Sequence, residues 1–141
     1  MTPSDLSKRL ERAKSATDFI EAQHELTQDL AAAGPNADSV TAILQFMEAN
    51  PDLDFGTPGP FVHFVERLPR SEYDPLVVAS VSRTPTTHTV WLLNRVLNGT
   101  KAAGARNGLI RVLRTVAEDP GANEAARERA KQYLDVQIAQ L

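Results

Sequence analysis

The chain has 141 residues, no cysteine and a net charge of −3, so we expect one domain whose core is large enough to need no disulfide. The lack of cysteine excludes a disulfide scaffold, a cysteine nucleophile and a thiolate zinc site. The polar start shows no secretory signal, and no apolar segment approaches the roughly 20 residues that cross a bilayer. We therefore expect a cytoplasmic protein without a membrane segment.

The two signs of charge are separated along the sequence. Residues 15–66 contain nine Asp or Glu and no Lys or Arg, whereas residues 75–117 contain six Lys or Arg and no Asp or Glu. Soluble domains usually intersperse both signs. The separation therefore predicts surface patches of opposite sign that meet another macromolecule.

Apolar residues recur at helical rather than alternating spacing in almost every segment. In chain order the stripes are Leu6 and Leu10, Phe19 to Ala33, Val40 to Met47, Phe61 to Leu68, Tyr73 to Val81, Val90 to Leu97, Leu109 to Ala117, and Ala126 to Leu141. This pattern predicts eight helices in a single all-α domain, residues 1–141. From about residue 37 the helices fall into antiparallel pairs of the size of a HEAT or armadillo unit, and an irregular helical bundle is the alternative.

Residues that are favourable as helix N-caps precede several of these stripes. The expected N-caps are Thr17, Asn36 or Asp38, Thr57 followed by Pro58, Ser71, and Thr86 or Thr87. Each side-chain oxygen can accept a hydrogen bond from a free backbone N–H of the first turn. Proline marks most of the helix ends.

Acidic residues form the first candidate binding surface. Glu21, Glu25 and Asp29 recur at i, i+4 and i+8, so they share one helix face. Like charges at this spacing cost about 0.2 to 0.5 kcal/mol each, which is tolerable if the face meets a basic partner. A solvated face explains the row equally well. Asp52 and Asp54 lie in the loop "DLDFGTPGP" and would extend the acidic surface.

The segment "SRTPTTHTVWLLNRVLN", residues 82–98, has a polar rim around an apolar helix. Arg83, His88 and Arg95 suit an acidic partner, or they pair with carboxylates of the same chain. We expect Asn94, in the middle of the helix, to hydrogen-bond to a turn of an adjacent helix.

Two other functional classes are alternatives to protein binding. A metal-dependent enzyme would use His63 and Glu66, at i and i+3, together with His88. No serine elbow and no phosphate-binding loop occurs, so we predict no catalysis, no metal and no cofactor. A nucleic-acid-binding repeat would use the basic span 83–114, but that span has only one aromatic residue, Trp91, for base stacking.

The basic residues of that alternative, besides Arg83 and Arg95, are Lys101, Arg106, Arg111 and Arg114.

Two runs resemble a known class of proteins. "FGTPGPFVHFVERL" and "YDPLVVASVSRTPTTHTVWLLNRVLN", within residues 55–98, are similar to the small α-helical immunity proteins found beside bacterial polymorphic or contact-dependent toxins. The resemblance implies a protein that neutralises a cognate toxin domain by tight binding and has no catalytic activity of its own. We therefore predict a protein partner rather than nucleic acid or a membrane.

Overall fold

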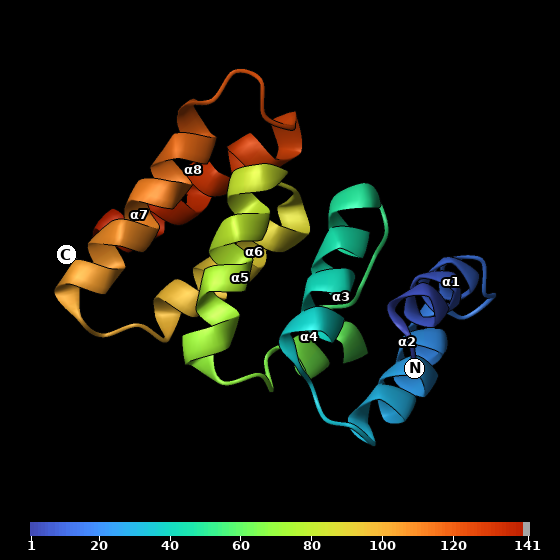
Figure 1. Ribbon diagram of the computed structural model, residues 1–141. Coiled ribbons are helices and arrows are strands. Elements are labelled where there is room, and N and C mark those ends of the chain that lie inside the picture. The colour runs from blue at the N-terminus through green and yellow to red at the C-terminus, as the bar shows by residue number, and fades with distance from the viewer. Residues whose placement is uncertain (140–141) are drawn as a thin grey trace. The chain divides into compact units, whose positions relative to one another are not determined.

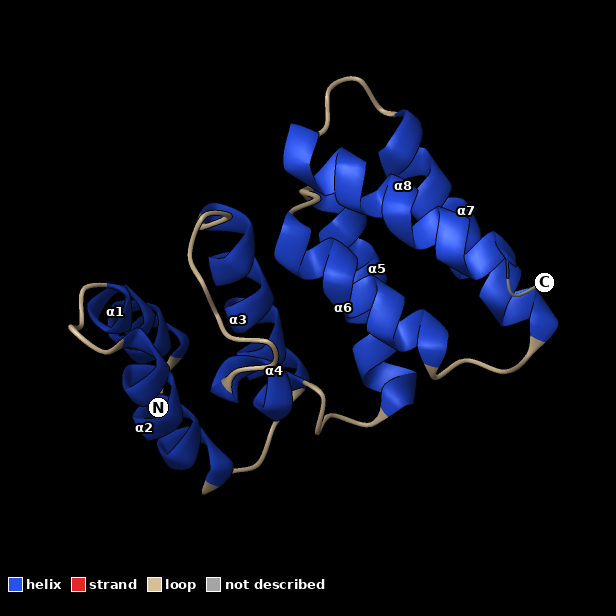
Figure 2. Cartoon of the chain, turned by 180° about the vertical axis from the view of Figure 1, so that it is seen from behind, coloured by secondary structure: helices blue, strands red, loops and turns tan. Residues whose placement is uncertain are grey.

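The structure is a computed structural model that describes residues 1–139, and within that range every regular element is an α-helix (Figures 1 and 2). The helices are α1 (Pro3–Lys14), α2 (Phe19–Ala31), α3 (Ala37–Ala49), α4 (Pro60–Val65), α5 (Arg70–Arg83), α6 (Thr87–Asn98), α7 (Ala103–Glu118) and α8 (Glu124–Ala139). The predicted all-α class is thereby confirmed. The HEAT- or armadillo-like superhelix and the single domain stay predictions.

The chain divides into two compact helical units, Met1–Leu76 and Val77–Leu141. The first holds α1 to α4 and the start of α5, and the second holds the rest of α5 and α6 to α8. Among the helices of residues 1–139, none combines the length and the apolar character that a bilayer crossing demands.

Several helix starts agree with the predicted caps. Asn36 caps α3 and Thr86 caps α6, and in both cases the cap and the third helical residue exchange hydrogen bonds. An unpredicted box of the same kind begins α1. There Thr2 and Asp5 bond reciprocally, and the hydrogen bonds from Thr2 hold the pKa of the Asp5 carboxyl below its usual 3.8.

Three predicted starts are wrong. Asp18 rather than Thr17 caps α2, because its carboxylate accepts from the backbone N–H of Glu21 at 3.0 Å. Thr57 and Pro58 lie in a loop, and α4 begins at Pro60 with Gly59 as the N-cap. Ser71 lies inside α5, and the backbone N–H groups of Glu72 and Tyr73 both donate to the Pro69 carbonyl at 2.9 Å.

The core of the first unit is built around four phenylalanines from different elements. Phe19 of α2, Phe46 of α3, Phe55 of the loop and Phe61 of α4 have ring centroids 5.4 to 6.4 Å apart, and most pairs meet edge to face. Such pairs contribute about 0.5 to 1.5 kcal/mol each beyond the area they bury. In this unit α1 packs on α2 and α3, and α4 packs on α2 and α3.

Two glycines allow the loop before α4 to fold tightly. Gly56 has a φ of +93°, and a Cβ on Gly59 would lie 1.7 Å from the carbonyl oxygen of Phe55. Gln23 of α2 is fully buried beside this loop, and its Oε1 accepts from the backbone N–H of Phe61 at 3.2 Å. Helix α2 therefore fixes the position at which α4 begins.

The second unit packs α6 against the antiparallel pair α7 and α8 (Figure 1). The predicted apolar stripes supply most of its fully buried residues, among them Val90, Leu93, Leu97, Leu113, Ala126 and Ala130. Three residues of the predicted stripes are exposed instead: Ile20 of α2, Ala33 just after α2, and Ile138 of α8. Leu141, the last residue of the predicted stripe, lies outside the described residues.

A buried amide connects the helices of the second unit. Gln137 of α8 is 1% exposed, and its Nε2 donates to Asn94 Oδ1 at 3.0 Å and to Asn98 Oδ1 at 2.7 Å. Its Oε1 accepts from Arg106 at 2.7 Å. Asn94 therefore bonds across to a neighbouring helix, as expected, but its partner is a side chain rather than a turn.

Candidate protein-binding surface

The charge separation seen along the sequence coincides with the two units. The first unit has six Lys or Arg and thirteen Asp or Glu, a net charge of −7. The second has nine Lys or Arg and five Asp or Glu, a net charge of +4. A strongly acidic unit favours contact with a basic molecule.

The acidic row of α2 is exposed, but α1 neutralises part of it. Asp29 forms an ion pair with Arg9 of α1, and Glu25 lines a shallow groove together with Arg9 and Arg12. Both arginines lie outside the span that lacks basic residues, so the sequence pattern did not reveal them. Glu21 of the same row is exposed and, within the described chain, has no ion-pair partner.

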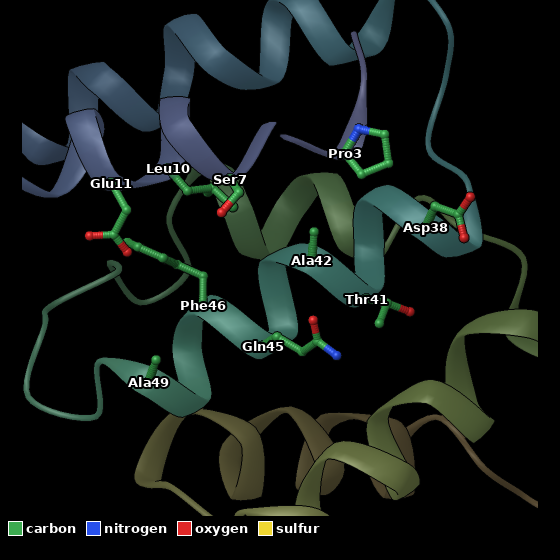
Figure 3. Close-up of a pocket in the computed structure, with 10 residues that line it drawn as sticks. All are labelled: Pro3, Ser7, Leu10, Glu11, Asp38, Thr41, Ala42, Gln45, Phe46 and Ala49. Carbon is green, nitrogen blue, oxygen red and sulfur yellow. The ribbon is translucent and has the colours of Figure 1, made fainter. Parts of the chain in front are cut away.

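A groove of about 500 Å³ lies between α1 and α3 (Figure 3). We call it the acidic groove. Its lining residues are Pro3, Ser7, Leu10, Glu11, Asp38, Thr41, Ala42, Gln45, Phe46 and Ala49. The floor includes the buried Leu10 and Phe46, and the side chains of Thr41 and Gln45 are polar. This combination of apolar and polar surface is typical of protein-binding sites.

The only charged residues of the acidic groove are two carboxylates, Glu11 of α1 and Asp38 at the start of α3. Figure 3 shows them at opposite ends of the groove. Lys14 approaches Glu11 only to 3.9 Å, and both side chains are exposed, so this pair contributes little. A second hollow of about 210 Å³ shares Pro3, Asp38 and Ala42 with the groove and adds Asp29.

The sequence did not identify Glu11 and Asp38 as a binding pair, because they are far apart in the chain and only the packing of α1 on α3 brings them to one groove. A spacing pattern within one helix finds Glu21, Glu25 and Asp29 but not a pair on two helices.

The predicted loop carboxylates have separate roles. Asp52 and Asp54 are both exposed, as expected. Asp54 accepts from the backbone N–H of Gly56 at 2.9 Å and so stabilises the turn before α4. Asp52 makes no hydrogen bond or ion pair among the described residues, and its carboxylate is open to a partner.

The basic residues predicted to bind a partner in residues 82–98 are less available for such contact than the carboxylates of the first unit. Arg95 is half-buried with its guanidinium 5.0 Å from the ring centroid of Trp91, a cation–π contact. Arg83 is exposed and His88 is half-buried, and each of the three has an interaction within the chain. This set is therefore a weaker candidate for a partner surface than the carboxylates of the first unit.

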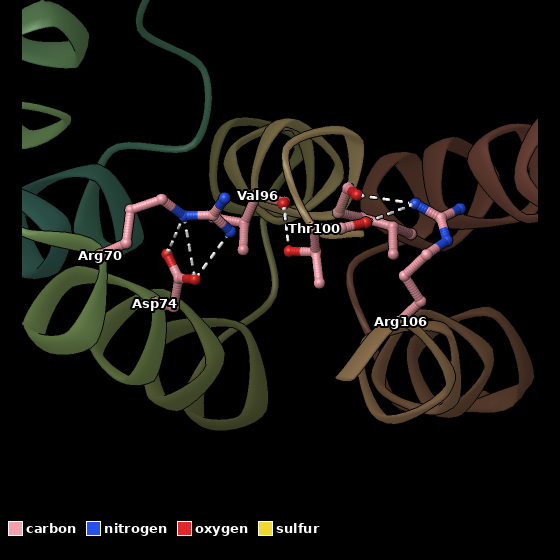
Figure 4. Close-up of polar contacts among 6 residues, drawn as sticks. Arg70, Asp74, Val96, Thr100 and Arg106 are labelled. Carbon is pink, nitrogen blue, oxygen red and sulfur yellow. Dashed lines mark hydrogen bonds and ion pairs between the residues drawn. The ribbon is translucent and has the colours of Figure 1, made fainter. Parts of the chain in front are cut away.

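One residue of the basic span of the nucleic-acid alternative, Arg106, is half-buried and bonded within the chain. Arg106 donates to the carbonyls of Leu97 at 2.9 Å and Thr100 at 3.1 Å (Figure 4). It also donates to Gln137 Oε1. Lys101, Arg111 and Arg114 remain exposed. Figure 4 also shows Thr100 bonded to the carbonyl of Val96, and the ion pair of Arg70 with Asp74.

The residues of the metal-enzyme alternative do not form a cluster of ligands. No three His, Asp or Glu side chains in residues 1–139 are placed to hold a metal ion together. His63 is an exposed residue of α4, and Glu66 is the C-cap of that helix. His63 instead shares a groove with His24 of α2.

Comparison with known protein families, with curated proteins and with solved structures finds no match to this chain. The resemblance of residues 55–98 to bacterial immunity proteins therefore stays a prediction, and the evidence for a function lies in the surface of the chain itself.

Proposed function

We propose that this chain is a non-catalytic, cytoplasmic binding protein that captures a basic protein partner in the acidic groove between α1 and α3. The partner that fits best is the toxin domain of a bacterial toxin system, which this chain neutralises by covering its working surface. The observation that carries the proposal is the composition of the groove, an apolar floor whose only charged lining residues are Glu11 and Asp38.

In the proposed mechanism, charge speeds the encounter with the partner and apolar contacts supply most of the affinity. The net charge of −7 on the first unit attracts a cationic partner and speeds encounter. An apolar side chain of the partner then packs on Leu10 and Phe46, while its Lys or Arg side chains meet Glu11 and Asp38. A few buried contacts of this kind usually supply most of the affinity of an interface.

Affinity capture from the source organism tests the binding, with mass spectrometry to identify the captured proteins. The groove variant is Glu11→Lys with Asp38→Lys, and the matched control is Glu118→Lys with Asp135→Lys. All four residues are exposed, and in each variant the net charge rises by four because two carboxylates are replaced by two ammonium groups. We expect a protein rich in Lys and Arg to be captured by the wild type and the control, and at least about tenfold less by the groove variant. Equal capture by the groove variant would contradict the proposal.

The inhibitory role has a separate test. The captured partner is expressed in a heterologous bacterium with and without this chain. We expect the partner alone to arrest growth and co-expression with the wild type, but not with the groove variant, to restore it. A partner that is harmless alone would contradict the toxin role and leave the binding role standing.

A further inference from the structure

We propose that a second groove, between α2 and α4, binds the phosphate group of a small phosphate monoester. This site is independent of the protein-binding role proposed above. The groove has a volume of about 300 Å³, which is the lower end of the range for small-molecule sites. We call it the basic groove, and it is formed by His24 and Gln28 of α2 with Pro60, His63, Phe64 and Arg67 of the α4 segment.

The charge of the basic groove is opposite to that of its surroundings. The first unit carries thirteen Asp or Glu, yet none of them lines this groove. His24 and His63 are the only two histidines of the unit, and both line it together with an arginine. A concave site lined by donors of one sign concentrates an anion.

The donors of the basic groove are not used elsewhere. The side chains of His24, His63 and Arg67 are exposed and make no hydrogen bond or ion pair with any described residue. Two other arginines of the first unit are ion-paired, Arg9 with Asp29 and Arg70 with Asp74, and Arg12 lines a groove that also contains Glu25. Arg67 differs from these three because it has no ion pair among the described residues and no carboxylate lines its groove.

The chemistry of these groups selects a phosphate rather than a metal ion. An arginine guanidinium donates two parallel hydrogen bonds to a phosphate, and imidazole and amide N–H groups donate further ones. A cation between the two imidazoles would be repelled by Arg67. Pro60 and the buried Phe64 supply an apolar wall against which the organic part of an ester can pack.

A nuclear magnetic resonance titration of the ¹⁵N-labelled chain tests the site. The ligands are inorganic phosphate, phenyl phosphate and phenol, added in chloride buffer at constant ionic strength. We expect phenyl phosphate and, at several-fold higher concentration, inorganic phosphate to shift the signals of His24, Gln28, His63 and Arg67. Phenol, which lacks the charged group, should shift them weakly. Shifts spread over all the exposed basic residues of the chain would overturn the proposal, since they would indicate charge screening only.

Variants of single cationic residues complete the test. Arg67→Gln removes a charge inside the basic groove, and Lys8→Gln removes one from an exposed position of α1 outside it. We expect Arg67→Gln to weaken phenyl phosphate binding at least about tenfold, as the loss of a charge-assisted hydrogen bond does. Lys8→Gln should leave it unchanged. Equal affinity in both variants would overturn the site, and circular dichroism confirms that each variant is folded.

Discussion

Two glutamines show how single residues escape prediction from sequence. Gln23 and Gln137 are both essentially fully buried, although glutamine is usually a surface residue. The amide of Gln137 bonds to three side chains of other elements, whereas Gln23 bonds only through its Oε1, which accepts from the N–H of Phe61, and its buried Nε2 has no partner among the described residues. These partners lie 31 to 43 residues away in the chain. No local pattern could have identified them.

The network around Gln137 gives a stability prediction. Gln137→Leu keeps the apolar volume but leaves Arg106 and Asn94 without this partner in a partly buried site. We expect a loss of about 2 kcal/mol in the free energy of unfolding, measured by urea titration with circular dichroism. Gln132→Leu, at an exposed position of the same helix, is the control and should change stability by less than about 0.5 kcal/mol. Similar losses in both variants would show that the network contributes nothing specific.

At the scale of elements, the sequence predicted the helices well and their ends less well. Within the described residues every predicted stripe overlaps an observed helix, because apolar residues at a 3.6-residue period bury one face, although the stripe that ends at Leu68 runs beyond α4. The predicted N-caps of α2, α4 and α5 were wrong. Adjacent residues such as Thr17 and Asp18 are both good caps, and only the tertiary path of the chain decides between them.

The loop before α4 gives a prediction about an element. Gly59→Ala places a methyl group within 1.7 Å of the Phe55 carbonyl oxygen, so backbone must move around the phenylalanine core. We expect a loss of about 3 kcal/mol or more in the free energy of unfolding, measured by urea titration.

The control for this prediction is Gly108→Ala in α7. A Cβ at Gly108 meets nothing within 4 Å, so the change only removes the flexibility of glycine from a helix. It should raise stability by about 0.5 to 1 kcal/mol. A Gly59→Ala protein as stable as the wild type would contradict the account of the loop.

At the scale of the whole molecule, the sequence predicted that the two signs of charge are separated, but not which residues lie next to the charged side chains in the folded chain. The net charges of −7 and +4 on the two units follow from the sequence once the division is known. What could not be predicted is which helices pack together. The packing of α1 on α2 and α3 sets Arg9 against Asp29 and creates the acidic groove. The structure therefore favours the acidic groove between α1 and α3 as the binding surface, whereas the sequence predicted the acidic row on α2.

The position of the bound partner on the surface tests the central claim most directly. The ¹⁵N-labelled chain is titrated with the captured basic partner, and the amide signals are followed by nuclear magnetic resonance. Our account predicts that the largest changes fall on the acidic groove, at Ser7, Glu11, Ala42 and Gln45, and that they weaken as salt is raised. Changes confined to α7 and α8, with the signals of the acidic groove unmoved, would contradict it.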